Sequence, residues 1–383
     1  MLPLRNQCSG CGACSVVCPR NCIEMTDDSE GFRYPIIEQA KCISCRKCET
    51  VCPIITSPYL SQGTTAVAAQ NREELIRKES SSGGIFSALA EYVLNKGGLV
   101  CAAIYDEKQM VQHVFIDRLD GIGAARGAKY AQSRSEKCFL KIKDELQKNR
   151  YVLFIGTPCQ TAGLYQYLGM KYKTLLLVDM ICHGVPSPKV WEKYLQERKA
   201  LDAPQSEFQN INLRSKESGW SHYSYSVKIQ YRNGIVYRKL QEQDWYMRGF
   251  TQNLYLRPSC SECRFKGVER CSDLTLGDCW GIWDIAPEFD DNQGTSLLLI
   301  HSEKGRQVWM NVNSEFRTYP LSIEQAISKN PSAIVCSKPH FKREQFFNAL
   351  YSETPMTKVI QDCLAPQSHN SFFQRLKEKI SKR

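Results

Sequence analysis

Short apolar runs alternate with amphipathic stretches through the middle of the chain, and this pattern predicts an α/β fold. Uninterrupted apolar residues predict buried strands at 98–105, 151–155 and 174–180. Helical periodicity predicts helices at 85–95, 135–149, 159–168 and 188–199. Because strands and helices alternate, we expect a mostly parallel sheet that carries ligand-binding loops at the carboxyl ends of its strands.

The pattern changes on both sides of this region. Residues 57–65 (SPYLSQGTT) have the composition of a linker, and cysteine dominates the chain before them. Beyond residue 201, strands are expected at 212–215 and 223–231. From His301 onward amphipathic helices without chemical motifs are expected, and His340 is expected to be structural.

Cysteine is concentrated at the amino-terminal end, where nine of the 19 cysteines precede residue 53. Disulfide frameworks are typical of small secreted chains. This chain has 383 residues and begins MLPLRNQCSG, without the apolar stretch of a signal peptide. We therefore expect metal ligation in a reducing compartment, the cytoplasm.

Two cysteine runs identify the metal. CSGCGACSVVCP and CISCRKCETVCP both have the spacing C-x2-C-x2-C-x3-C-P of bacterial ferredoxins. The first three cysteines of each run curl around one [4Fe–4S] cubane and the fourth points to the other, while glycines such as Gly10 and Gly12 permit the tight backbone. Structural zinc is the weaker alternative, because its cysteine pairs are separated by a longer gap. The predicted ligands are Cys8, Cys11, Cys14 and Cys52 for one cluster, and Cys42, Cys45, Cys48 and Cys18 for the other.

Three loops of the central region are candidate ligand sites. Residues 80–84 (SSSGG) precede a helix and form either an anion seat or a helix cap with a flexible lead-in. In 156–160 (GTPCQ), Cys159 is either a nucleophile with a lowered pKa or a packed thiol beside a cofactor. In 181–184 (ICHG), His183 is either a proton donor or a hydrogen-bonding partner of cofactor or backbone. No G-x-G-x-x-G follows a strand and no P-loop lysine is present, which excludes the standard nucleotide sites.

A second group of cysteines lies nearer the carboxyl end. Cys260 and Cys263 form a CxxC pair, and Cys271 and Cys279 follow. This spacing matches no standard site. A third iron–sulfur cluster, a zinc knuckle and thiols around a cofactor edge all remain open.

The overall charge favours acidic partners. Fifty basic and 40 acidic residues leave a net charge of +10, which suits a small acidic electron carrier or a phosphate-bearing cofactor. Nucleic acid is not expected, because there is no dense basic stripe interleaved with aromatic residues. The basic tail KEKISKR is interpreted as a solvated helix end. No apolar run approaches the ~20 residues that a membrane span needs.

With its motifs taken in order, the chain resembles the coenzyme F-420 hydrogenase/dehydrogenase beta-subunit family over nearly its whole length. The cluster runs are followed by ESSSGGIFSAL, GAKYAQS, FIGTPCQTAGL, LVDMICHGVPSPKVW and CSECRFKG…DLTLGDCWG. The chain departs from the family at Cys279, where an aromatic residue is common, and at Cys271, which is not a constant of the family. This departure weakens the case for a third metal site.

The resemblance implies a non-Rossmann FAD fold in which electrons pass between clusters and flavin. The implied FAD contacts are Ser81, Ser82, Gly83, Gly84, Lys129, Tyr130, Thr157, Pro158, Cys159, Gln160, His183 and Gly184. Lys129 would neutralise phosphate or stabilise the reduced flavin anion. His183, Cys159 and Lys129 are the candidate catalytic residues.

The fold class expected from all of this is α+β, in several domains. A ferredoxin-type domain with two clusters (1–60) is followed by an α/β flavin-binding region with a mixed sheet (66–201). A third part (202–383) contains the second cysteine group and carboxyl-terminal helices.

The function expected is that of an iron–sulfur flavoprotein oxidoreductase. It takes electrons from a ferredoxin and exchanges a hydride with an organic acceptor, which in relatives is a deazaflavin coenzyme or a chlorophyll-type substrate. The alternative is an electron-transfer subunit that serves a partner redox subunit and has no substrate site. A redox sensor is a third, weaker hypothesis.

Overall fold

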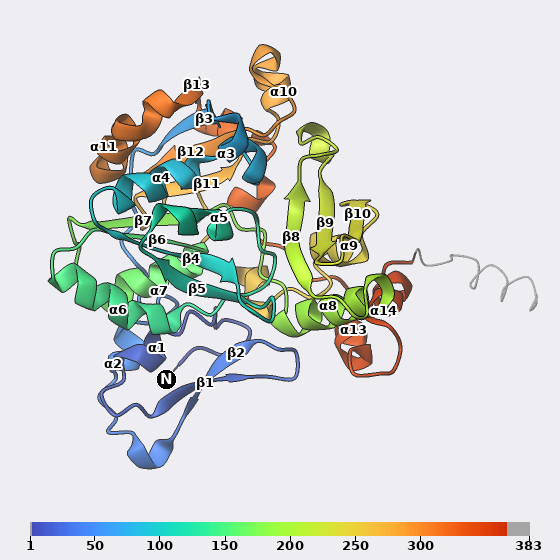
Figure 1. Ribbon diagram of the computed structural model, residues 1–383. Helices are drawn as coiled ribbons and strands as arrows, with labels where there is room; N and C mark the ends of the chain where they lie inside the picture. Colours follow the sequence, from blue (N-terminus) through green and yellow to red (C-terminus); the bar gives the residue numbers. More distant parts are fainter. Residues whose placement is uncertain (1, 366–383) are drawn as a thin grey trace, which may run out of the picture.

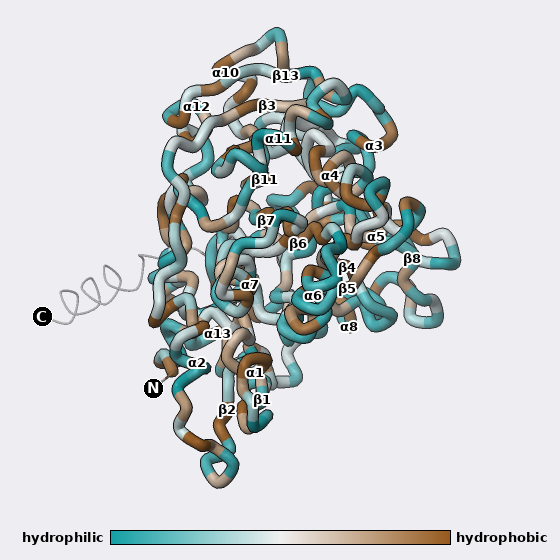
Figure 2. The backbone as a smooth tube through the Cα atoms, turned by 90° about the vertical axis from the view of Figure 1, so that its left-hand side faces the viewer, coloured by the Kyte–Doolittle hydropathy of each residue, from teal (hydrophilic) through white to brown (hydrophobic). Residues whose placement is uncertain are grey.

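The protein is described by a computed structural model over residues 2–365 (Figure 1). The basic tail KEKISKR lies outside these residues. An amino-terminal unit, residues 2–56, forms one end of the molecule in both views and is called the head below (Figures 1 and 2). A mixed α/β body follows it in the chain, as the sequence predicts.

The head contains an antiparallel hairpin and two short helices. Its elements are β1 (Ile23–Asp27), β2 (Arg33–Ile37), α1 (Ala13–Val17) and α2 (Lys47–Thr50). Cys22, which lies outside the ligand pattern, is 4% exposed and packs with Ile23 and Met25 in the small core of the head. The chain leaves the head through the predicted linker and enters the first strand of the body.

An eight-stranded mixed sheet forms the centre of the body, in the order β13-β3-β12-β11-β7-β6-β4-β5. The predicted strands are β4 (Leu99–Tyr105), β6 (Val152–Gly156) and β7 (Leu175–Met180), and they are parallel to one another as expected. β11 (Leu274–Asp278) extends this parallel group. The strands that flank the group are antiparallel: β5 (Val111–Ile116), β12 (Ser296–Ile300), β3 (Thr65–Asn71) and β13 (Phe316–Leu321).

Three expectations need correction, two about the sheet and one about a boundary in the chain. Only the central strands of the sheet are parallel, as expected. The antiparallel strands that flank them were not predicted from the apolar pattern of the sequence. β13 is also a strand within a region where only helices were expected. The boundary expected between residues 201 and 202 runs through a single sheet, since β11 and β12 pair on from β7.

Helices cover both faces of the sheet. α4 (Ile85–Leu94) and α11 (Glu303–Val312) pack on one face, and α6 (Glu136–Gln147) and α7 (Pro158–Leu168) pack on the other. α7 begins at Thr157 with a capping box and with proline at its first position, and it ends before Gly169 at φ 66°. The helices predicted from periodicity are therefore confirmed.

A third layer lies beside the central sheet (Figure 1). The helix α8 (Pro188–Asp202), expected from the sequence, packs there against a three-stranded antiparallel sheet of β8 (Phe208–Ser215), β9 (Ser226–Tyr231) and β10 (Val236–Leu240). The remaining helices are α3 (Glu74–Glu79), α5 (Ile122–Ala125), α9 (Trp245–Thr251), α10 (Ile282–Ile285), α12 (Ile323–Ser328), α13 (Arg343–Ala349) and α14 (Met356–Leu364). His340 stacks on Phe341 in a loop of this layer. None of the helices within residues 2–365 is long and apolar enough to cross a membrane.

The head is packed closely against the body, and glycines permit the approach. A Cβ atom on Gly12 would lie 2.3 Å from the Cβ atom of Glu136 in α6, and one on Gly163 in α7 would lie 2.9 Å from the Sγ atom of Cys11. Arg257 of the body is 1% exposed and donates to the carbonyl oxygens of Cys8 (2.8 Å) and Arg33 (2.9 Å) in the head. Head and body therefore share a buried interface.

The contact at Gly163 leads to a test of this interface. A Gly→Ala change inside a helix normally stabilises it by about 1 kcal/mol, whereas overpacking a close contact costs about 1–3 kcal/mol. We expect Gly163→Ala to lower the thermal unfolding temperature measured anaerobically. Gly123→Ala in α5 is the matched control, since its Cβ would meet nothing within 4 Å and it should leave that temperature unchanged or raise it. Equal effects of the two substitutions would contradict the close packing.

Candidate functional site

The head contains two cavities, and each is lined by one of the two predicted sets of cysteines. The first, the inner cavity, is lined by Cys8, Cys11, Cys14 and Cys52. The second, the outer cavity, is lined by Cys18, Cys42, Cys45 and Cys48. The fourth cysteine of each run therefore joins the other run's set, as the ferredoxin spacing predicts.

The thiols of the inner cavity are suited to bind cations. Burial, with smaller contributions from neighbouring Cys8 and Cys52, raises the pKa of Cys11 to about 12. Burial and the same neighbours raise the pKa of Cys14. Thiolates so placed repel one another and need positive charge between them, which iron supplies. Among the described residues, no three His, Cys, Asp or Glu side chains are grouped as ligands of a single ion. A cubane spreads its four cysteine ligands over four irons, whereas a structural zinc site brings four ligands to one ion.

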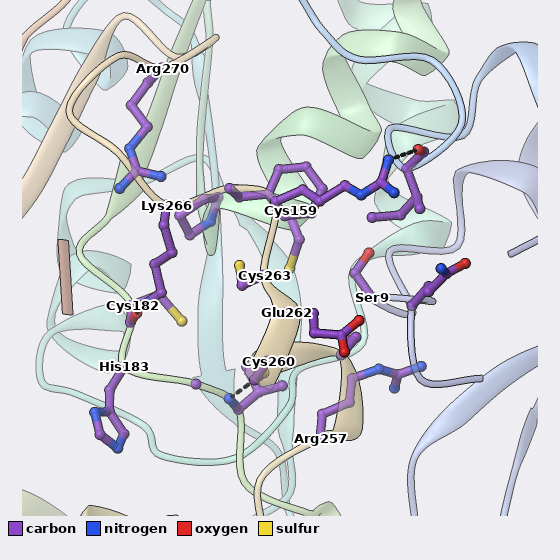
Figure 3. A pocket seen from close by; sticks show the side chains of 18 residues that line it. Ser9, Cys159, Cys182, His183, Arg257, Cys260, Glu262, Cys263, Lys266 and Arg270 are labelled. Carbon is purple, nitrogen blue, oxygen red and sulfur yellow. Dashed lines mark hydrogen bonds between the residues drawn. The ribbon is translucent and has the colours of Figure 1, made fainter. Parts of the chain in front are cut away.

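The fold brings together a third set of four cysteines in the body. Cys159, Cys182, Cys260 and Cys263 converge on one cavity of about 120 Å³ (Figure 3). β6 and β7 are adjacent and parallel, with Gly156 opposite Asp179. Cys159 and Cys182 each follow their member of that pair by three residues, so both thiols emerge at the same level of the sheet. Cys260 accepts a hydrogen bond from the backbone N–H of Val185 at 3.4 Å.

This third set corrects the group of cysteines expected from the sequence. Cys260 and Cys263 line this cavity, whereas Cys271 and Cys279 do not. The strand β11 lies between Cys271 and Cys279 in the chain. Cys279 is buried among apolar side chains with Ile282 and Phe289. The sequence offered a usable signal, since two cysteines stand directly after adjacent buried strands and a CxxC pair follows.

Three cations, of which the two arginines are buried, line the cavity of the third set. Arg257, Lys266 and Arg270 all line it. Arg270 is 4% exposed, and its Nε and Nη1 atoms have no hydrogen-bond partner among the described residues. Arg257 likewise makes no ion pair with a described carboxylate, although it is almost fully buried. Buried unpaired cations are unfavourable, so this cavity has the charge and the donor atoms for an anionic group such as a thiolate-bound iron–sulfur cluster.

A larger cavity, of about 530 Å³, lies at the carboxyl ends of the parallel strands, where the sequence places the ligand loops. Ten of the twelve residues that the resemblance implies as FAD contacts line it: Ser81, Ser82, Gly84, Lys129, Tyr130, Thr157, Cys159, Gln160, His183 and Gly184. Gly83 does not line it, because its backbone is pressed against β3 and β12; a Cβ atom there would lie 2.1 Å from the Ala69 oxygen. Pro158 lines the neighbouring cysteine cavity instead.

The loop 80–84 does not act as a side-chain helix cap. Gly84 precedes α4 with a φ of 93°, and no side chain bonds the first N–H groups of the helix. The hydroxyl of Ser82 donates to the Thr295 oxygen at 2.8 Å, whereas the hydroxyl of Ser81 is buried without a partner among the described residues. The amino end of α4 therefore opens into the large cavity with its N–H groups free, which favours the anion seat over the cap.

Lys129 is a half-buried cation that lines the same cavity. Its Nζ atom donates to the backbone oxygens of Arg126 (2.9 Å), Gly127 (3.1 Å) and Ala125 (3.3 Å). It makes no ion pair with any described carboxylate, and burial lowers the pKa of Lys129 to about 7. An anionic ligand in the cavity would stabilise its charged form.

The structure favours one of the two roles considered for His183 and one of the two considered for Cys159. His183 bonds Asn253 Oδ1 through Nε2 (2.6 Å) and the Ser332 hydroxyl through Nδ1 (3.3 Å), so both ring nitrogens are engaged within the protein. Its ring points away from the cysteine set in Figure 3. Burial raises the pKa of Cys159 well above its ordinary value, opposite to what a nucleophile needs. The hydrogen-bonding role of His183 and the packed, ligand-type role of Cys159 are therefore favoured.

The large cavity is also lined by a group of charged and aromatic residues that was not expected from the sequence. Arg214 forms a buried ion pair with Asp278 at 2.9 Å and donates to the Tyr130 hydroxyl at 3.1 Å. Tyr225 and Trp280 lie against its guanidinium. These residues come from β8, β11 and the segments beside β9 and β11, whose meeting only the tertiary fold decides.

Profiles of known protein families match most of the described chain. Residues 66–138 match the profile of the amino-terminal part of the coenzyme F420 hydrogenase/dehydrogenase beta subunit, and residues 149–321 match the profile of its carboxyl-terminal part. Residues 7–54 match a 4Fe-4S dicluster domain.

Individual relatives agree with these profiles. An uncharacterised protein of Methanocaldococcus jannaschii is 25% identical over 366 residues, covering 85% of this chain and 92% of its own. One of the subunits of the F(420)H(2) dehydrogenase of Methanosarcina mazei is 23% identical over 186 residues, 46% of this chain, and the match spans only 53% of that relative. A ferredoxin-like protein in the nif region of Sinorhizobium fredii is 37% identical over 57 residues, 13% of this chain and 81% of its own.

Among solved structures, a chain of the F420-reducing [NiFe] hydrogenase complex from Methanosarcina barkeri aligns with a TM-score of 0.46 and 19% identity. The alignment covers 72% of this chain and 91% of that one. The profile matches together span most of the body and the cluster motifs of the head. The chain therefore belongs to the coenzyme F420 hydrogenase/dehydrogenase beta-subunit family and has an amino-terminal 4Fe-4S dicluster domain.

Proposed function

We propose that the protein is an iron–sulfur flavoprotein oxidoreductase. It exchanges single electrons with a redox partner at the head and a hydride with an organic acceptor at the large cavity. Its cofactors are two [4Fe–4S] clusters in the head, a third at Cys159, Cys182, Cys260 and Cys263, and FAD in the large cavity. Clusters supply one-electron steps, and a flavin converts them into two-electron chemistry.

One observation carries this proposal: the four cavities adjoin in series. Cys14 and Cys48, which line the inner and outer cavities of the head, interact electrostatically. Ser9 and Ile54 line both the inner cavity and that of the third cysteine set. The third set's cavity in turn shares Cys159 and Cys182 with the large cavity. A continuous route thus runs from the exposed end of the head to the carboxyl ends of the parallel strands.

The chain's own residues would prepare each site for its group. The cysteines supply thiolates, and Arg257, Lys266 and Arg270 offset the negative charge of the third set. The free N–H groups at the start of α4 and the ammonium of Lys129 would hold the FAD phosphates. His183, bonded at both nitrogens, would fix the wall between the third set and the large cavity.

An electron-transfer subunit without a substrate site of its own remains the second candidate. It is favoured by the name of the Methanosarcina mazei relative, which is one part of a dehydrogenase of several subunits. It is also favoured by exposed apolar side chains at Ile334, Val335 and Phe341, beside the segment that borders the large cavity. Turnover by the isolated chain with a small acceptor would rule it out. All nineteen cysteines are unpaired, which suits a reducing compartment such as the cytoplasm for either function.

Cofactor content is the first test of the proposal. Protein purified anaerobically should contain about twelve irons, four for each of three clusters, together with FAD. Iron assay, flavin extraction and an acceptor screen under anaerobic conditions measure this directly. Reconstituted protein that holds iron yet refuses FAD would overturn the flavoprotein, and lack of any flavin would favour a redox sensor.

The third cluster has its own test. Cys182→Ser and Cys260→Ser should each lower the iron content by about four per chain and remove one set of electron paramagnetic resonance signals. Cys271→Ser is the matched control, because this cysteine lies outside all three sets and its replacement should leave the iron content unchanged. Loss of iron in Cys271→Ser together with retention in Cys182→Ser would restore the grouping inferred from the sequence.

The pH dependence of FAD binding tests Lys129. Burial lowers the pKa of Lys129 to about 7 in the free site, and a bound phosphate would raise it, so binding takes up a proton. FAD affinity should therefore fall as pH rises above about 7, by up to about tenfold per pH unit. Titration of deflavinated protein between pH 6 and pH 9 measures this slope. Lys129→Met should flatten it and the exposed Lys137→Met should not; equal slopes would exclude Lys129.

A further inference from the structure

The two cluster loops of the head are repeats of one motif, yet they differ in what they present. In the alignment of the two runs, Ser9, Gly10, Gly12 and Ala13 of the inner loop correspond to Ile43, Ser44, Arg46 and Lys47 of the outer loop. After the fourth cysteine of each run, Arg20 beside the outer cavity corresponds to Ile54 beside the inner one. Small or apolar residues on the inner side are thus replaced by cations and an isoleucine on the outer side.

Packing explains the inner loop. Gly10 and Gly12 have φ values of 70° and 76° and lie against Arg257 and Glu136 of the body, where a Cβ atom would clash. Glycine is therefore required there for both conformation and space.

Packing does not explain the outer loop. Ser44 and Arg46 adopt the same left-handed backbone, with φ values of 54° and 58°, but they are exposed to solvent. A residue with a Cβ atom is strained in this conformation, and glycine is not. Glycine would fit at position 46, so we attribute the retained strain to a role of the exposed Arg46 side chain at the surface. Strained residues of this kind are concentrated at functional sites.

The exposed groups form a basic patch around an apolar centre, defined by Arg20, Ile43, Arg46 and Lys47. Ile43 is 60% exposed, and Cys45 is the exposed cysteine among the eight of the head. Arg20 and Lys47 make no ion pair with any described residue, and Arg46 interacts electrostatically with Glu49, whereas nearby Lys41 is paired with Glu38 at 2.7 Å. All four residues of the patch line the outer cavity of the head.

We infer that this basic patch is the docking surface for a small acidic protein that carries one electron. The inference rests on the proposed function and names its electron partner. Charge complementarity selects an acidic surface and steers the encounter, and the exposed Ile43 supplies the apolar centre of the contact. On docking, the carrier is oxidised by one electron and the chain is reduced by one; no atom is transferred.

The test measures reduction by an acidic ferredoxin against ionic strength. Reduced plant-type ferredoxin is mixed anaerobically with the holoprotein. The bleaching of the holoprotein's clusters as they are reduced is followed by stopped flow. The second-order rate constant should fall as salt rises. Arg20→Glu, Arg46→Glu and Lys47→Glu combined should lower it about tenfold or more at low salt. Lys78→Glu, Arg232→Glu and Lys239→Glu combined are the matched control, because these exposed cations lie on α3 and the β9–β10 hairpin.

A second variant keeps the test valid if the charge reversal disturbs the cluster. Ile43→Ser, Ser44→Gly, Arg46→Gly and Lys47→Ala combined copy the inner loop onto the outer one and relieve its backbone strain. This variant should keep its iron and its photoreduction by 5-deazariboflavin, yet react several-fold more slowly with ferredoxin.

Each outcome of these measurements has a defined meaning. An unchanged ferredoxin rate in both variants, a rate independent of salt, or binding of the patch to anionic lipid vesicles with no response to ferredoxin would overturn the inference. Photoreduced clusters that never reduce FAD would instead overturn the proposed function.

Discussion

The close packing of head against body is the constraint on which the arrangement of sites depends. Gly12 against Glu136 and Gly163 against Cys11 bring a helix of the body into contact with a cysteine of the inner cavity. Arg257 then joins the backbone of the head to the segment that holds Cys260. Because this interface is buried, the head does not behave as a tethered module, and its inner cavity is held beside the third cysteine set.

The charges of the molecule follow the same route. Burial raises the pKa of Cys11 in the inner cavity and the pKa of Cys182 in the third set to about 12, so thiolates at both places need nearby positive charge. Around the third set that charge comes from Arg257, Lys266 and Arg270, and at the large cavity it comes from Lys129. At the outer end the cations turn to solvent instead. In the proposed function, the cations beside the cavities hold anionic groups and the exposed cations of the head attract an acidic partner.

The parallel strands explain why thiols and the large cavity meet. β6 and β7 end in loops that carry Cys159 and Cys182 at equal offsets from paired residues, and both loops also border the large cavity. A residue there has one side towards the cysteines and the other towards the cavity. This geometry favours other roles than catalysis for His183 and Cys159. His183 is held by hydrogen bonds at both ring nitrogens, and Cys159 faces the cysteine set.

The sequence by itself determined the two clusters of the head, the three central strands, the helices around them and the loops of the large cavity. Those features depend on spacing and periodicity, which are local properties of the chain. Only the tertiary structure decided that Cys159 and Cys182 join Cys260 and Cys263, and that Cys271 and Cys279 do not. Sequence distance suggested the opposite grouping, because β11 carries Cys279 away from Cys271 while adjacent parallel strands bring distant thiols to one level.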